Sequence, residues 1–187
     1  IEFDDDNSIV IAVGDRTGYQ LGYQAPNPTA DFMDRAELNM AFGDILRAAY
    51  NIATDDYTME NNGAVGGLNS TNPNNASGPG GKSFYWGDYW TGIGADRFQG
   101  GVGALAILPG SGEVMFSLAD AIDYYSNGII WMSNTTGAAN KKLEVYQGSP
   151  DGDSPSFAKG SGLGDIEMAC DPAPIEIGNI VWGDENQ

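Results

Sequence analysis

The stretch Ser8-Ile9-Val10-Ile11-Ala12-Val13 places four β-branched residues within six consecutive positions. Such a run is typical of a strand that is buried on both faces of a sheet. An acidic segment, residues 4–7, precedes it, and a glycine-bounded turn, residues 14–18, follows it. We therefore predict that the chain opens with a buried strand.

Nine further segments combine short apolar or aromatic runs with flanking Gly, Asn, Ser and Pro, which is the pattern of strands separated by turns. Residues 29–51 are ambiguous, because Thr29 could cap a helix, but Gly43 disfavours one long helix and we favour a strand. A helical turn is also compatible with residues 119–125. The expected strands cover residues 19–23, 36–42, 50–61, 83–91, 100–108, 113–118, 128–133, 142–147 and 175–182.

This succession predicts an all-β fold, a jelly-roll or immunoglobulin-like β-sandwich with at most short helices. Gly/Asn/Ser-rich stretches at residues 63–82 and 148–164 indicate long exposed loops. We expect residues 1–13 to form an N-terminal strand and residues 14–187 to form a single sandwich domain.

The charge is strongly acidic, with 26 acidic and 8 basic residues among 187 and a formal net charge of −18. Nucleic-acid phosphate is excluded as a natural partner, and no apolar run is long enough for a transmembrane helix. The chain starts at Ile1 rather than Met, which we interpret as a mature extracellular or cell-surface protein whose signal peptide has been removed. Cys170 is the single cysteine and is expected to be a buried small apolar residue.

The chain contains no histidine. A Ser-His-Asp site, a Cys-His site and a histidine-containing zinc site therefore lack a required residue. No phosphate-binding or dinucleotide-binding motif is present. A glycosidase using two carboxylates stays open as an alternative, but no pair of acids stands out. We predict that the chain is not an enzyme.

Calcium is the metal that the acidic loops favour, because it prefers carboxylate and carbonyl oxygen ligands. The candidate ligands form clusters, and the alternative is that they are solvated acidic loops. These candidates are Asp4, Asp5, Asp6, Asp55, Asp56, Asp151 and Asp153.

Three sequons make Asn69, Asn75 and Asn134 candidate N-glycosylation sites on expected loops and turns. A separate aromatic group, with Trp86 and Trp90 beside Asp88, could form a stacking platform for sugars. The alternative is a core strand with one exposed ring.

The N-terminal segment is too apolar to remain in water. Its apolar residues are Ile1, Phe3, Ile9, Val10, Ile11 and Val13. They could complete the sheet of a neighbouring copy, which repeated head to tail would build a filament. The alternative is an ordinary strand within its own domain. The receiving groove is expected along residues 101–108 and 175–182.

Two stretches resemble secreted fibre proteins of the TasA/camelysin type and their archaeal relatives. They are residues 8–15 with 19–23, and Asp56-Tyr57-Thr58-Met59-Glu60-Asn61-Asn62-Gly63. The resemblance covers about the first 60 residues. It implies a sandwich that polymerises by donor-strand exchange into biofilm or surface fibres, whereas residues 42–84 depart from any compact version of that pattern.

We therefore predict a structural subunit of an extracellular filament, with copies of itself as partners. The alternative is a secreted carbohydrate-binding or adhesin module that uses Trp86 and Trp90, with or without calcium.

Overall fold

The computed structural model describes residues 1–14, 43–72, 78–90, 98–119, 121–122, 126–147 and 163–168. Within these ranges the chain is nearly all β and contains one 3₁₀ turn (Pro79–Gly81) and no α-helix. The prediction of an all-β sandwich is confirmed. None of the described residues forms a helix that could span a bilayer.

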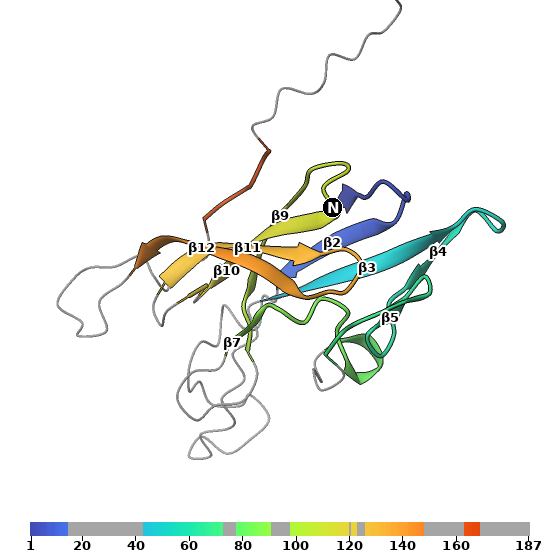
Figure 1. Ribbon diagram of the computed structural model, residues 1–187, viewed down its shortest axis with the longest axis horizontal. Coiled ribbons are helices and arrows are strands. Elements are labelled where there is room, and N and C mark those ends of the chain that lie inside the picture. Colours follow the sequence, from blue (N-terminus) through green and yellow to red (C-terminus); the bar gives the residue numbers. More distant parts are fainter. Residues whose placement is uncertain are drawn as a thin grey trace, which may run out of the picture.

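One sheet contains the N-terminal strands, all antiparallel and in sequence order. Its strands are β1 (Glu2–Phe3), β2 (Ile9–Gly14), β3 (Gly43–Asn51) and β4 (Asp56–Met59). The β-branched run of the sequence becomes β2, an inner strand between β1 and β3 (Figure 1). The prediction that it is buried on both faces is wrong, because Val10 alone is fully buried and Val13 is exposed.

The second sheet has the order β12-β11-β10-β9 and is also antiparallel. Its strands are β9 (Gly101–Ile107), β10 (Glu113–Ala119), β11 (Ser126–Ser133) and β12 (Ala139–Gln147). Strand β9 lies beside β2 and β3, so the two sheets pack together along this side (Figure 1).

Two small hairpins complete the described part. One pairs β5 (Ala64–Val65) with β6 (Leu68–Asn69), and the other pairs β7 (Tyr89–Trp90) with β8 (Phe98–Gln99).

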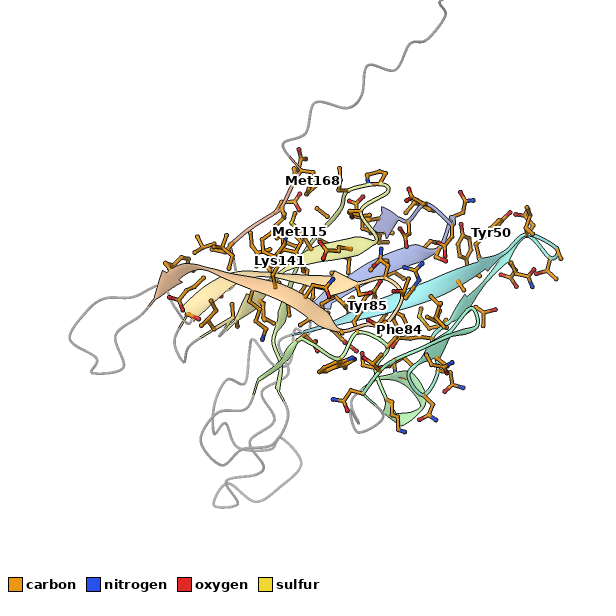
Figure 2. The ribbon with its side chains drawn as sticks, viewed as in Figure 1. Tyr50, Phe84, Tyr85, Met115, Lys141 and Met168 are labelled. Carbon is orange, nitrogen blue, oxygen red and sulfur yellow. The ribbon has the colours of Figure 1, made fainter. Side chains whose placement is uncertain are left out.

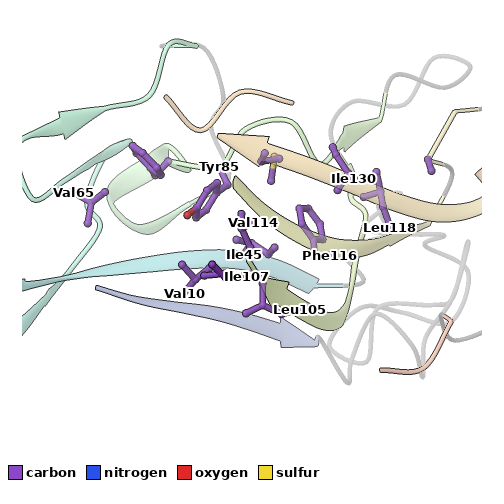
Figure 3. Packing of buried hydrophobic residues seen from close by; sticks show 13 residues of the cluster. Val10, Ile45, Val65, Tyr85, Leu105, Ile107, Val114, Phe116, Leu118 and Ile130 are labelled. Carbon is purple, nitrogen blue, oxygen red and sulfur yellow. The ribbon is translucent and has the colours of Figure 1, made fainter. Parts of the chain in front are cut away.

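The hydrophobic core lies between the two sheets (Figure 3). Val10 and Ile45 enter it from the first sheet, and alternate residues of β9, β10 and β11 enter it from the second. Phe84 and Tyr85 fill the space between them with their rings edge to face and their centroids 5.1 Å apart. Burial of these side chains supplies the main driving force for folding.

The hairpins of the second sheet confirm the sequence prediction. Residues 100–108 and 113–118 form β9 and β10, and residues 128–133 and 142–147 lie within β11 and β12. In the turn between β9 and β10, Gly110 and Gly112 have φ of 78° and 68°, a conformation that glycine adopts without strain.

Three predictions on residues 50–91 are wrong in detail. Residues 50–61 are not one strand, because a turn with Asp55 at φ 51° separates β3 from β4. Residues 83–91 form a strand only at β7, because Phe84 and Tyr85 are consecutive and both buried, which a strand with one core face does not allow. The stretch 63–82 is not simply an exposed loop, since Val65 of β5 belongs to the core.

The described residues cover the remaining strand, helix and loop predictions only in part. Strand β3 begins at Gly43, just after the expected strand at 36–42, which lies outside the described residues together with 19–23 and 175–182. Where residues 119–125 are described, β10 ends at Ala119 and no helix follows. Most of the expected loop 148–164 also lies outside the described residues.

Candidate functional site: Arg47 and the N-terminal acidic turn

A tight acidic turn joins β1 to β2. The amide of Asp4 donates to the Ser8 carbonyl (2.9 Å), and the amide of Asn7 donates to the Asp4 carbonyl (2.9 Å). Asn7 has φ of 62°, a left-handed conformation that asparagine tolerates better than most residues. The turn therefore holds the side chains of Asp4, Asp5 and Asp6 at the start of β2.

Arg47 of β3 forms ion pairs with two aspartates of this turn. It is 2% exposed, with Nη1 2.8 Å from Asp4 Oδ2 and Nη2 2.9 Å from Asp6 Oδ2. Desolvation acts to lower the pKa of Arg47, but Tyr85 and the two aspartates outweigh it and raise the pKa. The guanidinium is thus a permanent buried charge that requires these partners.

Tyr85 and Asn134 close the network into a ring. Arg47 Nη1 donates to the Tyr85 hydroxyl (3.3 Å), which donates to Asn134 Oδ1 (2.8 Å). Asn134 Nδ2 then donates to Asp4 Oδ2 (3.0 Å), the same oxygen that pairs with Arg47. Burial raises the pKa of Tyr85, so its hydroxyl stays protonated and able to donate. Figure 2 shows Tyr85 beside the labelled Phe84.

Two more carboxylates bind backbone amides around this ring. Asp5 Oδ2 accepts from the Gly110 amide (2.6 Å) in the turn between β9 and β10. Glu60 is 1% exposed and accepts from the amides of Arg47 (2.8 Å) and Phe84 (2.9 Å). We call Asp4, Asp5, Asp6, Arg47, Tyr85 and Asn134 the Arg47 clamp. It connects the N-terminal turn to β3, to the aromatic segment and to the β9–β10 and β11–β12 turns of the second sheet.

The predicted calcium ligands Asp4, Asp5 and Asp6 are all placed, and each accepts hydrogen bonds from the protein. Asp55 accepts from the Tyr50 hydroxyl (2.9 Å) at the β3–β4 turn, and Asp56 is exposed. Across the described ranges no three acidic or cysteine side chains gather in a geometry that would hold a metal. Asp151 and Asp153 lie outside these ranges, and calcium binding stays a prediction.

The sequons fall in different settings. Asn69 is exposed in β6, and Asn75 lies outside the described residues. Asn134 is 3% exposed, and its Nδ2, the atom that would carry a glycan, donates to Asp4. Glycosylation at the three sites stays a prediction, and in the folded chain the Asn134 nitrogen is occupied by its hydrogen bond to Asp4.

The structure describes the side chain of only one of the two tryptophans in the expected sugar platform. Trp86 is half-buried, and its indole nitrogen donates to Thr71 Oγ1 (3.1 Å). Trp90 belongs to β7, but the position of its side chain is outside the described part, as is Cys170. Sugar binding stays a prediction, and a glycan array with W86A as control would test it.

The six apolar residues of the predicted donor strand differ in how deeply they are buried. Val10 is fully buried, Ile9 and Ile11 are half-buried, and Ile1, Phe3 and Val13 are exposed. Here β2 pairs with β3 of its own chain, as in the alternative of an ordinary strand. The sequence does not predict the roles of Arg47 and Glu60. Arg47 pairs with Asp4, 43 positions away, and its amide donates to Glu60, 13 positions away, and no local pattern indicates either partner.

Comparison with known proteins gives two relatives and no family. No protein-family model matches the chain, and no solved structure matches it. It is 30% identical over 192 residues to Colossin-A of Dictyostelium discoideum, covering 97% of this chain and 2% of that protein. It is 31% identical over 150 residues to Colossin-B of the same organism, covering 78% of this chain and 4% of that protein. The chain thus corresponds to a small part of each relative.

Proposed function

We propose that the chain is a structural subunit of an extracellular filament or surface assembly, in which copies exchange their N-terminal strands. The observation that carries this proposal is the division of the Arg47 clamp. In the sequence, Asp4, Asp5 and Asp6 come before the connection between β2 and β3. Their partners Arg47, Tyr85 and Asn134 come after it.

In this proposal residues 1–14 are the donor. Their contacts with β3, Arg47, Gly110 and Asn134 are made by the β2–β3 register and by the three aspartates. A copy from a neighbouring molecule would find the same amides, the same guanidinium and the same core site for Val10.

The connecting stretch, residues 15–42, is long enough for exchange. A chain of this length spans up to about 90 Å when extended, more than the width of a domain of this size. Strand exchange adds no new contacts and needs only that the connection reach a second copy.

The surface of the donor also favours a neighbour. Phe3 is exposed on β1 and Ile1 is exposed just before it; β1 is the edge strand of its sheet, where unpaired backbone groups can bind another chain.

Deletion of residues 1–8 tests the proposal. It removes the three aspartates of the clamp and should abolish fibres in electron micrographs and large species in sedimentation velocity. Unchanged fibres would contradict the donor role.

The deletion could also unfold the chain, so a second experiment adds a synthetic peptide of residues 1–14 in trans. The peptide should bind the truncated chain and raise its melting temperature. A D4N/D6N peptide serves as the matched control and should bind more weakly. Failure of the unmodified peptide to bind would contradict the proposal.

A further inference from the structure

Asp88 is a buried carboxyl group that lacks a matched partner. It is 1% exposed, and its Oδ2 is inaccessible to solvent and makes no hydrogen bond to the described residues. A buried polar atom without a partner costs free energy, so a native structure that keeps one invites an explanation.

The backbone places Asp88 between the two sheets. A Cβ atom on the preceding Gly87 would lie 2.7 Å from Ala139 Cβ and 2.8 Å from Met132 Sδ, so this segment lies against β11 and β12. On the other side, the Asp88 carbonyl accepts from the Gly100 amide (3.2 Å), and Gly100 forms a bridge with Gly43 of β3.

Lys142 of β12 lies on the side of the sheet that faces Asp88. It is in register with Ile130, a fully buried core residue, and residues in register share one face of a sheet. Its neighbour Lys141 lies on the opposite face, 4.5 Å above the Trp131 ring. Lys142 lies on the edge strand β12 and is exposed.

Electrostatics link Asp88 to Lys142 and to Asp44, which follows Gly43 in β3. Desolvation, and then the charge of Asp44, raise the pKa of Asp88 well above its usual range. Desolvation lowers the pKa of Lys142, although Asp88 acts in the opposite direction. The raised pKa of Asp88 favours its neutral carboxylic acid, and the lowered pKa of Lys142 makes it easier to form the neutral amine; these are the forms that can condense with one another.

We infer that Lys142 and Asp88 form an intramolecular amide bond between their side chains. The Lys142 Nζ attacks Cγ of the protonated Asp88, a C–N bond forms, and the bond from Cγ to the hydroxyl oxygen breaks. The Asp44 carboxylate accepts a proton from the nitrogen and returns it to the departing oxygen, which leaves as water. No oxidant or reductant is needed.

The reaction requires one movement. None of the three ion pairs among the described residues, each within 4.0 Å, includes Lys142, so its side chain must turn inward to reach Asp88. Once the side chain has turned inward, the reaction joins two groups of one folded chain, which favours it over reaction between separate molecules. The bond would fasten the edge strand β12 to the interior, whereas the N-terminal strand stays exchangeable.

Intact-mass spectrometry of the full chain tests the inference. The expected mass is lower than that of the sequence by one water, about 18 Da. Tryptic digestion should give a branched peptide that joins the segments of Asp88 and Lys142, without cleavage after Lys142. K142R and D44N should restore the full mass, whereas K141R, on the outer face, should keep the deficit.

Two results would overturn the inference. One is a wild-type mass equal to that of the sequence. The other is a deficit that persists in K142R, because the lost water would then come from another site. Both readouts are independent of filament formation, so the proposed function can fail without affecting this test.

Discussion

The Arg47 clamp and the cluster around Asp88 both bury ionisable groups between the same two sheets, but only in the clamp does every buried group have matched partners. Arg47 meets two carboxylates, and Glu60 next to it satisfies both of its oxygens with backbone amides. Asp88 is as deeply buried as Glu60, yet one of its oxygens has no partner among the described residues. The degree of burial therefore does not distinguish these two carboxyl groups. Their partners do, since a fully hydrogen-bonded carboxylate stabilises the fold, whereas one with an unpartnered oxygen is a candidate for reaction.

Substitution of Arg47 should have the largest effect, because it leaves Asp4 and Tyr85 buried without their cation. R47A should lower the free energy of unfolding by about 3–5 kcal/mol, measured by urea denaturation at pH 7. R47K keeps a charge but cannot reach both aspartates with a planar fork, so it should lose less. A loss below about 1 kcal/mol in R47A would show that the clamp is not a stabilising network.

Glu60 provides the direct contrast with Asp88. E60Q replaces one acceptor oxygen with an amide group that faces a backbone N–H, so stability should fall by about 1–3 kcal/mol. E167Q, at an exposed position, is the matched control and should change stability little. Equal thermal melts of E60Q and the wild type would remove the distinction between the two carboxylates.

The smallest expected effect is the change in folding stability with pH that comes from the lowered pKa of Asp6. Desolvation acts to raise the pKa of Asp6, but hydrogen bonds from Ser8 and the charge of Arg47 outweigh it and lower the pKa. The stability that Asp6 contributes is therefore present above its unfolded value of 3.8 and is lost as the pH falls through the lower folded value.

Urea midpoints of the wild type and D6N at pH 7, 5 and 3 check this prediction. The difference between them should be small, because Asp6 is 56% exposed, and should shrink toward pH 3. A difference that grows as the pH falls would have the wrong sign.

The sequence predicted the parts of the fold that local chemistry determines. The hairpins of the second sheet follow from alternating apolar residues around glycine turns, and β2 follows from its β-branched run. The boundary of β3 was missed, because the buried charge of Arg47 interrupts its apolar pattern.

The candidate site was harder to predict, since its members come from distant positions. The sequence predicts the acidic triplet as a calcium site, and that stays a prediction, but it does not indicate the partners that the structure gives these aspartates, which are Arg47, Gly110 and Asn134. Neither Tyr85 nor Asn134 carries a local signal that it closes a ring. Only the packing of the two sheets brings these residues together.

Disulfide trapping across the β2–β3 register tests strand exchange most directly. Ile11 and Leu46 are paired in this register, so I11C/L46C in a C170S background reports whether β2 pairs with its own chain or with another. The control pair S117C/I129C joins β10 to β11 and should form only within one chain. On non-reducing gels of the assembled protein, we expect a ladder of linked chains for I11C/L46C and monomer for the control. Fully oxidised I11C/L46C that runs only as monomer would contradict strand exchange.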